Sequence, residues 1–433
     1  MAINAFFILL LLLFFFLFCS TWIGMTLFLI GYIGLNFFSR IPPLAAIGNV
    51  LWNQSSSQSM MALPLFIFMG EILVRSRIAE SLFNGLAPWV NKLPGGLLHV
   101  NILASTFFAA VSGSVSATTA TVGNITIPEF KKRKYSDELS IGSLACSGTL
   151  GIMIPPSMPM LMYGIISGVS IGQLFVAGLF PGLIMAALFS GYIIIRCRYN
   201  PSLAPTTGEH FTWRDRMAGI PMLLPVVLLI ALVLGSIYAG WTTPTEAAAV
   251  GSFGAILFAM YTRTMNWHVL KTALLGTVNT TCMIMLIVFG ASYFSVVIGY
   301  LGIPRALARA IAAADIGPYT LLIIVSLFYV VLGCLVDGFS MIVMSVPIIL
   351  PLMKAAGFDP LWFGIYLVVM VQIAQITPPV GFNLFLLNGL TGLEVFWIAK
   401  AALPFFLLMI SFTILMTIFP SIVTYLPYLR SLS

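Results

Sequence analysis

Charged residues are scarce in this sequence. Of its 433 residues, 7% are Asp, Glu, Lys or Arg and 60% are hydrophobic, whereas an average soluble domain is roughly 25% charged. So few charges cannot cover the surface of a water-soluble fold. Apolar stretches of about 20 residues, the length that crosses a hydrocarbon core of about 30 Å, recur along the chain. The sequence therefore predicts an all-α polytopic membrane protein, with the lipid bilayer as its solvent.

Residues that build enzyme centres are also sparse. The three histidines are far apart and outside any HExxH pattern, and the five cysteines form no CxxC pair or other metal-ligand spacing. The sequence contains no GxxxxGK[ST] motif, which excludes ATP hydrolysis through a P-loop. We predict that the protein is not an enzyme and has no catalytic residues and no cofactor.

The net charge of +7 comes from basic residues in short loops between apolar segments. Two such loops, 131–134 and 196–216, should be cytoplasmic by the positive-inside rule, so the basic balance does not indicate a nucleic acid partner. The apolar segment 5–18 resembles the core of a signal peptide, but it lacks a basic start and runs on into the apolar stretch 22–38. We expect it to be retained, as one long or two short membrane helices.

The two halves of the chain have prolines at matching positions. Pro128 and the pair Pro155-Pro156 have counterparts at Pro351 and the pair Pro378-Pro379, all separated by the same interval. Each half is predicted to contain, in order, a membrane helix, an amphipathic surface helix (78–90 and 303–314), a re-entrant helical hairpin, a discontinuous transmembrane helix and a further membrane helix. If each apolar segment between the two halves crosses the membrane once, the two repeats have inverted topology, which is a recurrent architecture of secondary transporters.

These patterns divide the chain into five parts. They are N-terminal scaffold helices and their connection (1–59), a first repeat (60–195) with hairpin 97–130 and broken helix 139–167, a cytoplasmic loop and linking helices (196–271), a second repeat (272–420) with hairpin 318–353 and broken helix 360–389, and a C-terminal tail (421–433).

Small hydroxyl residues and glycines interrupt the apolar stretch 97–130 at 111–124. A straight helix over that stretch would be about 50 Å long, too long for one crossing, so two half-length helices meeting at a polar tip fit better. Irregular backbone at membrane depth is tolerated only where it is buried in protein or lines an aqueous cavity. The tip therefore faces an ion or solute, unless its small residues serve only close helix packing.

In the second hairpin, Asp337 is the only acidic residue between Asp315 and Asp359. A carboxylate at membrane depth is costly unless it is paired, hydrated or bound to a cation, so Asp337 is a candidate ion ligand. It could equally cap the following half-helix, because it stands before Gly338. Both roles can hold together.

Paired prolines remove backbone donors and push the preceding residue out of helical geometry. Helices should therefore break at Pro155-Pro156 and at Pro378-Pro379. A break frees carbonyl oxygens for Na⁺ and offers half-helix N-termini to an anion. A simple kink is the alternative.

These motifs together resemble those of the large membrane subunit of TRAP (tripartite ATP-independent periplasmic) transporters, which belong to a superfamily of elevator-type carriers. The two Pro-Pro motifs, 151–157 and 377–383, are the most specific part of the likeness, which covers nearly the whole chain. The resemblance implies Na⁺-driven import of an organic acid anion, of the sialic acid or C4-dicarboxylate class, across the bacterial inner membrane. It also implies a separate small four-helix membrane subunit and a periplasmic binding protein as partners.

By the same resemblance, Na⁺ sits between each hairpin tip and the adjoining helix break, with the solute between the two Na⁺ sites. The implied ligands of one Na⁺ site are Ser112, Gly113, Ser114, Thr118, Gly148 and Thr149. Those of the other are Asp337, Gly338, Ser340, Gln375, Thr377 and Pro378. The implied solute contacts are Ser116, Pro156, Ser157, Pro379 and Asn383. A proton-coupled carrier or an ion channel of the same superfamily, independent of a binding protein, is the alternative function.

Overall fold

The structure is a computed structural model that describes residues 2–205, 211–334, 336–379 and 381–431. All regular secondary structure in these ranges is helical: twenty α-helices and two short 3₁₀ helices, Leu150–Ile152 and Pro201–Leu203. The predicted all-α class is confirmed. The apolar N-terminal stretch forms two helices, α1 (Ala2–Phe18) and α2 (Ile23–Phe38), which pack against each other.

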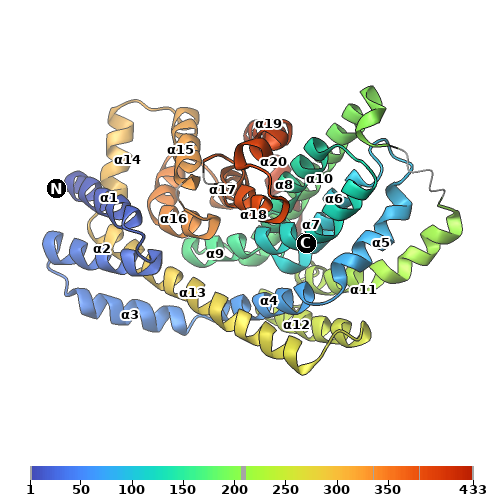
Figure 1. The fold of residues 1–433 in the computed structure, drawn as a ribbon. Coiled ribbons are helices and arrows are strands. Elements are labelled where there is room, and N and C mark those ends of the chain that lie inside the picture. The colour runs from blue at the N-terminus through green and yellow to red at the C-terminus, as the bar shows by residue number, and fades with distance from the viewer. Residues whose placement is uncertain (1, 206–210, 335, 380, 432–433) are drawn as a thin grey trace.

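Long helices form a row along the lower edge of Figure 1. Helix α13 contacts its neighbours α2, α3 and α4, and α12 contacts α4 and α11. We call α2, α3, α4, α11, α12 and α13 the row. Its members not yet given are α3 (Pro43–Ser55), α4 (Gln58–Val74), α11 (Trp213–Tyr238), α12 (Pro244–Tyr261) and α13 (Trp267–Tyr300).

The helices above the row pack together as a second unit, which we call the bundle (Figure 1). Its first half contains α6 (Leu98–Ser112), α7 (Val115–Lys132), α8 (Asp137–Thr149), α9 (Met158–Ser167) and α10 (Ile171–Tyr199). Its second half contains α15 (Pro318–Gly333), α16 (Gly338–Ala355), α17 (Pro360–Gln375), α18 (Phe382–Thr391), α19 (Val395–Ile418) and α20 (Ser421–Ser431). Helices α5 (Ile78–Val90) and α14 (Ile303–Ala313) link the row to the bundle.

All four predicted interruptions are present. Segments 97–130, 139–167, 318–353 and 360–389 each contain two α-helices, and both Pro-Pro bonds at the breaks of the discontinuous helices are cis. The helix order α4 to α10 is repeated as α13 to α19. The inverted direction of the second copy and the exact part boundaries remain predictions. Leu335 and Val380, as well as residues 206–210 of the predicted cytoplasmic loop and 432–433 of the predicted tail, lie outside the described residues.

The two predicted surface helices differ in their packing. Helix α5 buries most of its apolar side chains against α6 and α11, whereas in α14 only Ile303 is buried. Helix α5 is thus an integral part of the packed structure. Helix α14, with Arg305 and Arg309 in an otherwise apolar sequence, suits the membrane interface better.

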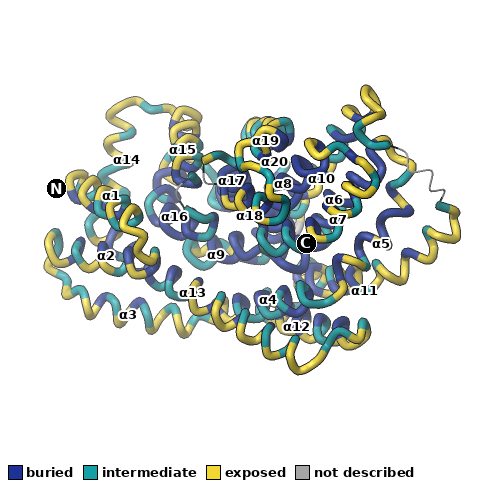
Figure 2. Tube along the Cα trace, in the orientation of Figure 1, coloured by how far each residue is buried: buried dark blue, intermediate teal, exposed yellow. Residues whose placement is uncertain are grey.

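The outer surface of the protein is apolar. Figure 2 shows buried residues concentrated at the centre and exposed residues on the outer helices. Large hydrophobic side chains are exposed on α11, α12 and α15, among them Leu228 (58% exposed), Phe253 (63%) and Ile323 (61%). Among the described helices, α10, α11, α13, α16 and α19 are long and apolar enough to cross a membrane, and the bent pair α3 and α4 together makes a sixth candidate. Lipid is the solvent that such a surface requires.

Candidate ion and solute site

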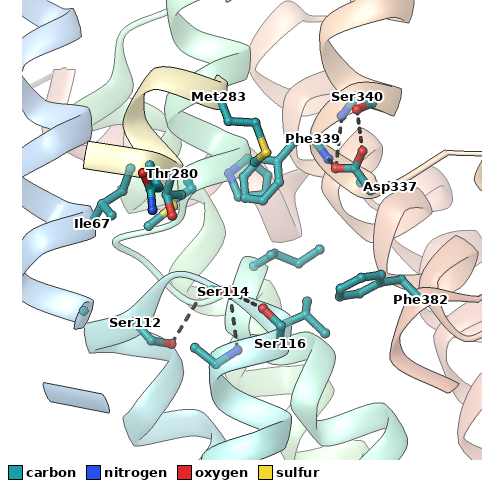
Figure 3. Close-up of a pocket in the computed structure, with 18 of the residues that line it drawn as sticks. Ile67, Ser112, Ser114, Ser116, Thr280, Met283, Asp337, Phe339, Ser340 and Phe382 are labelled. Atoms are coloured by element: carbon teal, nitrogen blue, oxygen red, sulfur yellow. Dashed lines mark hydrogen bonds between the residues drawn. The ribbon is translucent and has the colours of Figure 1, made fainter. Parts of the chain in front are cut away.

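A cavity of about 1310 Å³ lies between the row and the bundle. Residues of α2, α4 and α13 line one wall, and the tips of both hairpins line the other, together with residues of α9 and α18. Figure 3 shows Ser112, Ser114 and Ser116 of the first tip facing the space that Asp337 and Ser340 of the second tip also border. The fold therefore brings two tips that are distant in the sequence to one cavity.

Backbone geometry at Gly113 builds the first tip. Gly113 ends α6 with a positive φ of 60°, a conformation that glycine adopts without steric penalty. Ser114 then caps α7, its hydroxyl accepting from the backbone N–H of Ala117 at 3.4 Å. The hydroxyls of Ser112 and Thr118 lie 3.0 Å apart, and those of Ser114 and Ser116 lie 3.1 Å apart. The result is a compact group of hydroxyl oxygens at the cavity wall.

The first tip packs directly against the break between α8 and α9. A Cβ atom at Gly113 would lie 2.8 Å from the carbonyl oxygen of Pro156, and one at Gly151 would lie 2.6 Å from that of Ser114. Only glycines permit this approach. Oxygen atoms of the tip and of the broken helix are consequently close together, which is the arrangement that a Na⁺ site between them needs.

Asp337 caps the second half of hairpin 2. Its Oδ2 accepts from the backbone N–H groups of Phe339 (3.0 Å) and Ser340 (3.4 Å), and the Ser340 hydroxyl donates to Oδ1. The capping role expected as one alternative is therefore present. Asp337 also lines the cavity, and its role as an ion ligand remains a prediction beside the cap.

The second tip contacts its own broken helix in the same manner. A Cβ at Gly338 would lie 2.6 Å from the Gln375 amide nitrogen. The Cys334 thiol lies 3.5 Å from the Pro378 carbonyl oxygen and 3.3 Å from that of Val330, and its one hydrogen can be donated to either. Each hairpin tip therefore rests on the break of the discontinuous helix that follows it in the chain.

The predicted site residues fall into two groups. Those that line the cavity are Ser112, Ser114, Ser116, Asp337, Gly338, Ser340 and Gln375. Those that do not line it are Gly113, Thr118, Gly148, Thr149, Pro156, Ser157, Thr377, Pro378, Pro379 and Asn383.

Several residues of the second group have structural partners. The Ser157 hydroxyl, 1% exposed, caps α9 and donates to the Ile152 carbonyl. The Asn383 amide, 0% exposed, donates to the Ala145 carbonyl at 2.6 Å. Thr377 donates to the Ile373 carbonyl at 2.7 Å. The solute contacts of Ser157 and Asn383 remain predictions.

A hydrogen bond between the two broken helices was not expected from the sequence. Gln372 donates its amide to the Thr149 carbonyl at 2.9 Å, joining the two repeats. The side-chain oxygens of Thr119, Gln372, Gln375 and Asn383 are buried without a hydrogen-bond partner among the described residues. Unpaired oxygens at the centre of a bundle are costly, and they are the atoms that a desolvated cation could use.

The row contributes further polar residues that sequence reasoning missed. Glu71 and Arg75 of α4 and Asn279 and Thr280 of α13 line the cavity. Among the described residues, no group of three His, Cys, Asp or Glu side chains could hold a metal ion. The lining is mainly apolar, and its polar side chains carry hydroxyl, amide, carboxylate and guanidinium groups.

The sequence from residue 10 to residue 422 matches the family model described as "Tripartite ATP-independent periplasmic transporter, DctM component". The chain belongs to this family. Because the family is a TRAP permease family, the protein is a multi-pass membrane transporter and not an enzyme.

Curated relatives agree with this TRAP permease assignment. The chain is 32% identical to the C4-dicarboxylate TRAP transporter large permease protein of Pseudomonas aeruginosa, with 87% of this chain and 88% of that protein aligned. It is 30% identical to the sialic acid TRAP transporter large permease protein of Vibrio cholerae (86% of each). It is 31% identical to the ectoine TRAP transporter large permease protein of Halomonas elongata (85% of this chain, 86% of that protein).

The fold of the TRAP permease also resembles a solved structure. The crystal structure of the YdaH transporter of Alcanivorax borkumensis superposes with a TM-score of 0.64 over 92% of this chain and 97% of that one, at 14% sequence identity. At that identity the likeness concerns the fold alone.

Proposed function

We propose that this TRAP permease imports an organic acid anion together with Na⁺, as the transport subunit of a binding-protein-dependent system in the bacterial inner membrane. The observation that supports this most is the cavity bordered by both hairpin tips, each of which packs against a helix break. Such discontinuous elements are where secondary transporters place coupling ions and solute.

Cotransport of a cation such as Na⁺ would offset the charge of the proposed solute. An inside-negative potential opposes entry of an anion by about 2.3 kcal/mol per charge per 100 mV. Two or more Na⁺ entering with a monoanion make the step electrically downhill. Na⁺ bound at Ser112 and Ser114 and at Asp337 would also order the tips that face the solute.

The two-part architecture suggests how access alternates. The bundle contains both hairpins and both broken helices, and the row lies along one side of it. We propose that the bundle moves as a body past the row, an elevator mechanism, with α5 and α14 as the connecting arms.

Membership of the family supports two partners: a small four-helix membrane subunit and a periplasmic binding protein that delivers the solute. The relatives named above transport solutes with a carboxylate group, either C4-dicarboxylates, sialic acid or ectoine. We propose the same solute chemistry here, with sialic acid and C4-dicarboxylates as the first classes to test.

Proton coupling is the second candidate. Asp337 lines the cavity, and an acidic residue at membrane depth can belong to a proton pathway as well as to a cation site. Uptake through such a carrier would follow a pH gradient and ignore Na⁺.

The test is uptake of labelled succinate and labelled sialic acid into proteoliposomes that contain this chain and its small subunit. Each solute is measured with and without an inward Na⁺ gradient, and with and without its binding protein. Accumulation that needs both Na⁺ and the binding protein supports the proposal. Uptake that is independent of Na⁺ but follows a pH gradient supports proton coupling and contradicts the proposed Na⁺ sites.

A further inference from the structure

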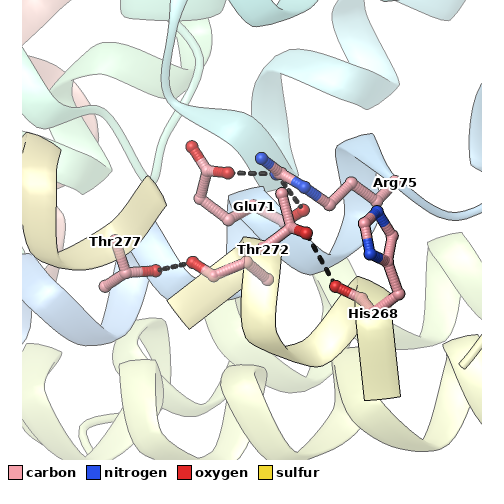
Figure 4. Close-up of polar contacts among 6 residues, drawn as sticks. Glu71, Arg75, His268, Thr272 and Thr277 are labelled. Carbon is pink, nitrogen blue, oxygen red and sulfur yellow. Dashed lines mark hydrogen bonds and ion pairs between the residues drawn. The ribbon is translucent and has the colours of Figure 1, made fainter. Parts of the chain in front are cut away.

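An ion pair lies on the wall of the cavity opposite the bundle. Arg75 and Glu71 stand one turn apart on α4, and both line the cavity. The Arg75 Nη1 group donates to the Glu71 carboxylate Oε2 and, at 2.9 Å, to the Glu71 carbonyl oxygen. Figure 4 shows the pair between α4 and the first turns of α13. Neither residue belongs to the hairpins or the helix breaks.

The charges around the cavity make Arg75 distinctive. Among the described residues that line it, Arg75 is the one cation, and Glu71 and Asp337 are the anions. The charge of the Asp337 carboxylate is already shared with three donors of its own helix. An anionic solute in this cavity would therefore find two fixed negative charges and a single positive one. Arg75 is the side chain whose charge favours its entry.

The guanidinium retains hydrogen-bonding capacity. Both of its contacts use Nη1, whereas a guanidinium has five N–H donors and can bind a carboxylate through two parallel bonds. The side chains of Arg75 and Glu71 are 27% and 24% exposed, so they are open to the cavity. A solute carboxylate can reach the donors that Glu71 does not occupy.

The neighbouring helix fits Glu71 closely. Gly276 of α13 faces the carboxylate, and a Cβ atom there would lie 2.6 Å from Glu71 Oε2. Glu71 thus has a defined place beside Arg75. In the absence of solute it neutralises Arg75, which avoids an unpaired charge in a partly desolvated wall.

We infer that Arg75 is a stationary subsite for the carboxylate of the transported solute, and that Glu71 is an internal competitor that keeps Arg75 paired when the cavity is empty and promotes release. When the solute binds, its carboxylate replaces that of Glu71 beside Arg75, so the number of ion pairs does not fall. Because α4 belongs to the row, Arg75 contacts the solute only while the bundle faces this cavity. This inference rests on the proposed transport of an organic acid anion.

The experiment compares variants in the uptake assay with labelled succinate and sialic acid, at saturating binding protein and Na⁺. We expect Arg75→Gln to lower the initial rate at least tenfold, while the half-saturating Na⁺ concentration of the residual uptake stays within twofold of wild type. Glu71→Gln removes the competitor but leaves the cation, so its rate should fall less than that of Arg75→Gln. Arg77→Gln is the matched control, because Arg77 is exposed and does not line the cavity.

Two further variants separate solute binding from a purely structural ion pair. The double variant Glu71→Gln/Arg75→Gln leaves no unpaired charge and should assemble normally, yet we expect it to transport as poorly as Arg75→Gln. The charge swap Glu71→Arg/Arg75→Glu should also fail. Wild-type rates in Arg75→Gln, or recovery in the double variant or the swap, would overturn the inference. All comparisons are relative to wild-type uptake, so they remain readable if the driving ion proves not to be Na⁺.

Discussion

Asp337 shows how one side chain can have a structural and a functional role. It caps α16 through two backbone N–H groups, and it faces the cavity. A cap needs only an acceptor oxygen, which asparagine supplies as well as aspartate. A cation also needs the negative charge. The two roles can therefore be separated by a single substitution.

We expect Asp337→Asn to fold normally and to raise the half-saturating Na⁺ concentration for uptake about tenfold, since loss of a charged ligand costs about 1.4 kcal/mol or more. Uptake titrated with Na⁺ measures this. Asp359→Asn is the control, because Asp359 caps α17 in the same way but does not line the cavity. An unchanged Na⁺ dependence in Asp337→Asn would remove Asp337 from the ion site.

Thr377 tests the second Na⁺ site in a different way. Its hydroxyl already donates to the Ile373 carbonyl, so an oxygen lone pair remains to accept a cation. We expect Thr377→Val, which keeps the side-chain shape, to weaken Na⁺ dependence severalfold in the same titration. Na⁺-dependent uptake identical to wild type would show that the hydroxyl is not a ligand.

At the scale of elements, the contact between a hairpin tip and a helix break depends on glycine. Gly113 and Gly168 both end helices with positive φ, 60° and 74° respectively. A Cβ at Gly113 would meet the Pro156 carbonyl oxygen at 2.8 Å, whereas nothing lies within 4 Å of one at Gly168. The backbone requirement is therefore the same at the two sites, and only Gly113 adds a packing requirement.

We expect Gly168→Ala to lower the free energy of unfolding by about 1 kcal/mol through backbone strain alone, with uptake retained. Gly113→Ala should lose more stability, because the tip must move away from the α8–α9 break, and uptake should fall at least tenfold. Thermal unfolding of the purified protein and uptake measure the two effects. Equal behaviour of the two variants would mean that the tip does not need its contact with Pro156.

At the scale of the whole molecule, the division into row and bundle is the feature that an elevator mechanism needs. Contacts between the two parts include the approach of α4 to the first tip, where a Cβ at Gly70 would lie 3.5 Å from the Ser112 Cα. Within the row, Gln54 of α3 donates to Ser292 of α13 at 2.6 Å. The pair Gly70 and Ser112 joins the row to the bundle, whereas Gln54 and Ser292 both belong to the row.

Crosslinking these two pairs tests the motion. We expect Gly70→Cys/Ser112→Cys, once joined by oxidation or a short bifunctional thiol reagent, to block uptake, and a reductant to restore it where the link is a disulfide. Gln54→Cys/Ser292→Cys, treated identically, should keep transporting. Each pair is compared with its own uncrosslinked form, which accounts for the cysteine substitutions themselves. Full uptake with the first pair linked would exclude movement of the bundle relative to the row.

The local pattern of the sequence determined the solvent, the helices and their breaks. Long apolar stretches require a lipid environment. A Pro-Pro pair cannot continue a helix, and a glycine followed by a serine can end one helix and begin the next. These effects act over a few residues, so the four interruptions and the two tips could be predicted, and Asp337 could be identified as both cap and candidate ligand.

Which polar groups share a cavity was decided by tertiary packing alone. The resemblance implies Ser157 and Asn383 as solute contacts, and only the structure shows that they donate to backbone carbonyls, those of Ile152 and Ala145. Glu71, Arg75 and Asn279 lie on helices that look like ordinary membrane segments, and only the packing of α4 beside α13 places them opposite the tips. A buried polar atom takes the partner that reaches it in space, and that partner can be hundreds of residues away in the chain, as Asn383 is from Ala145.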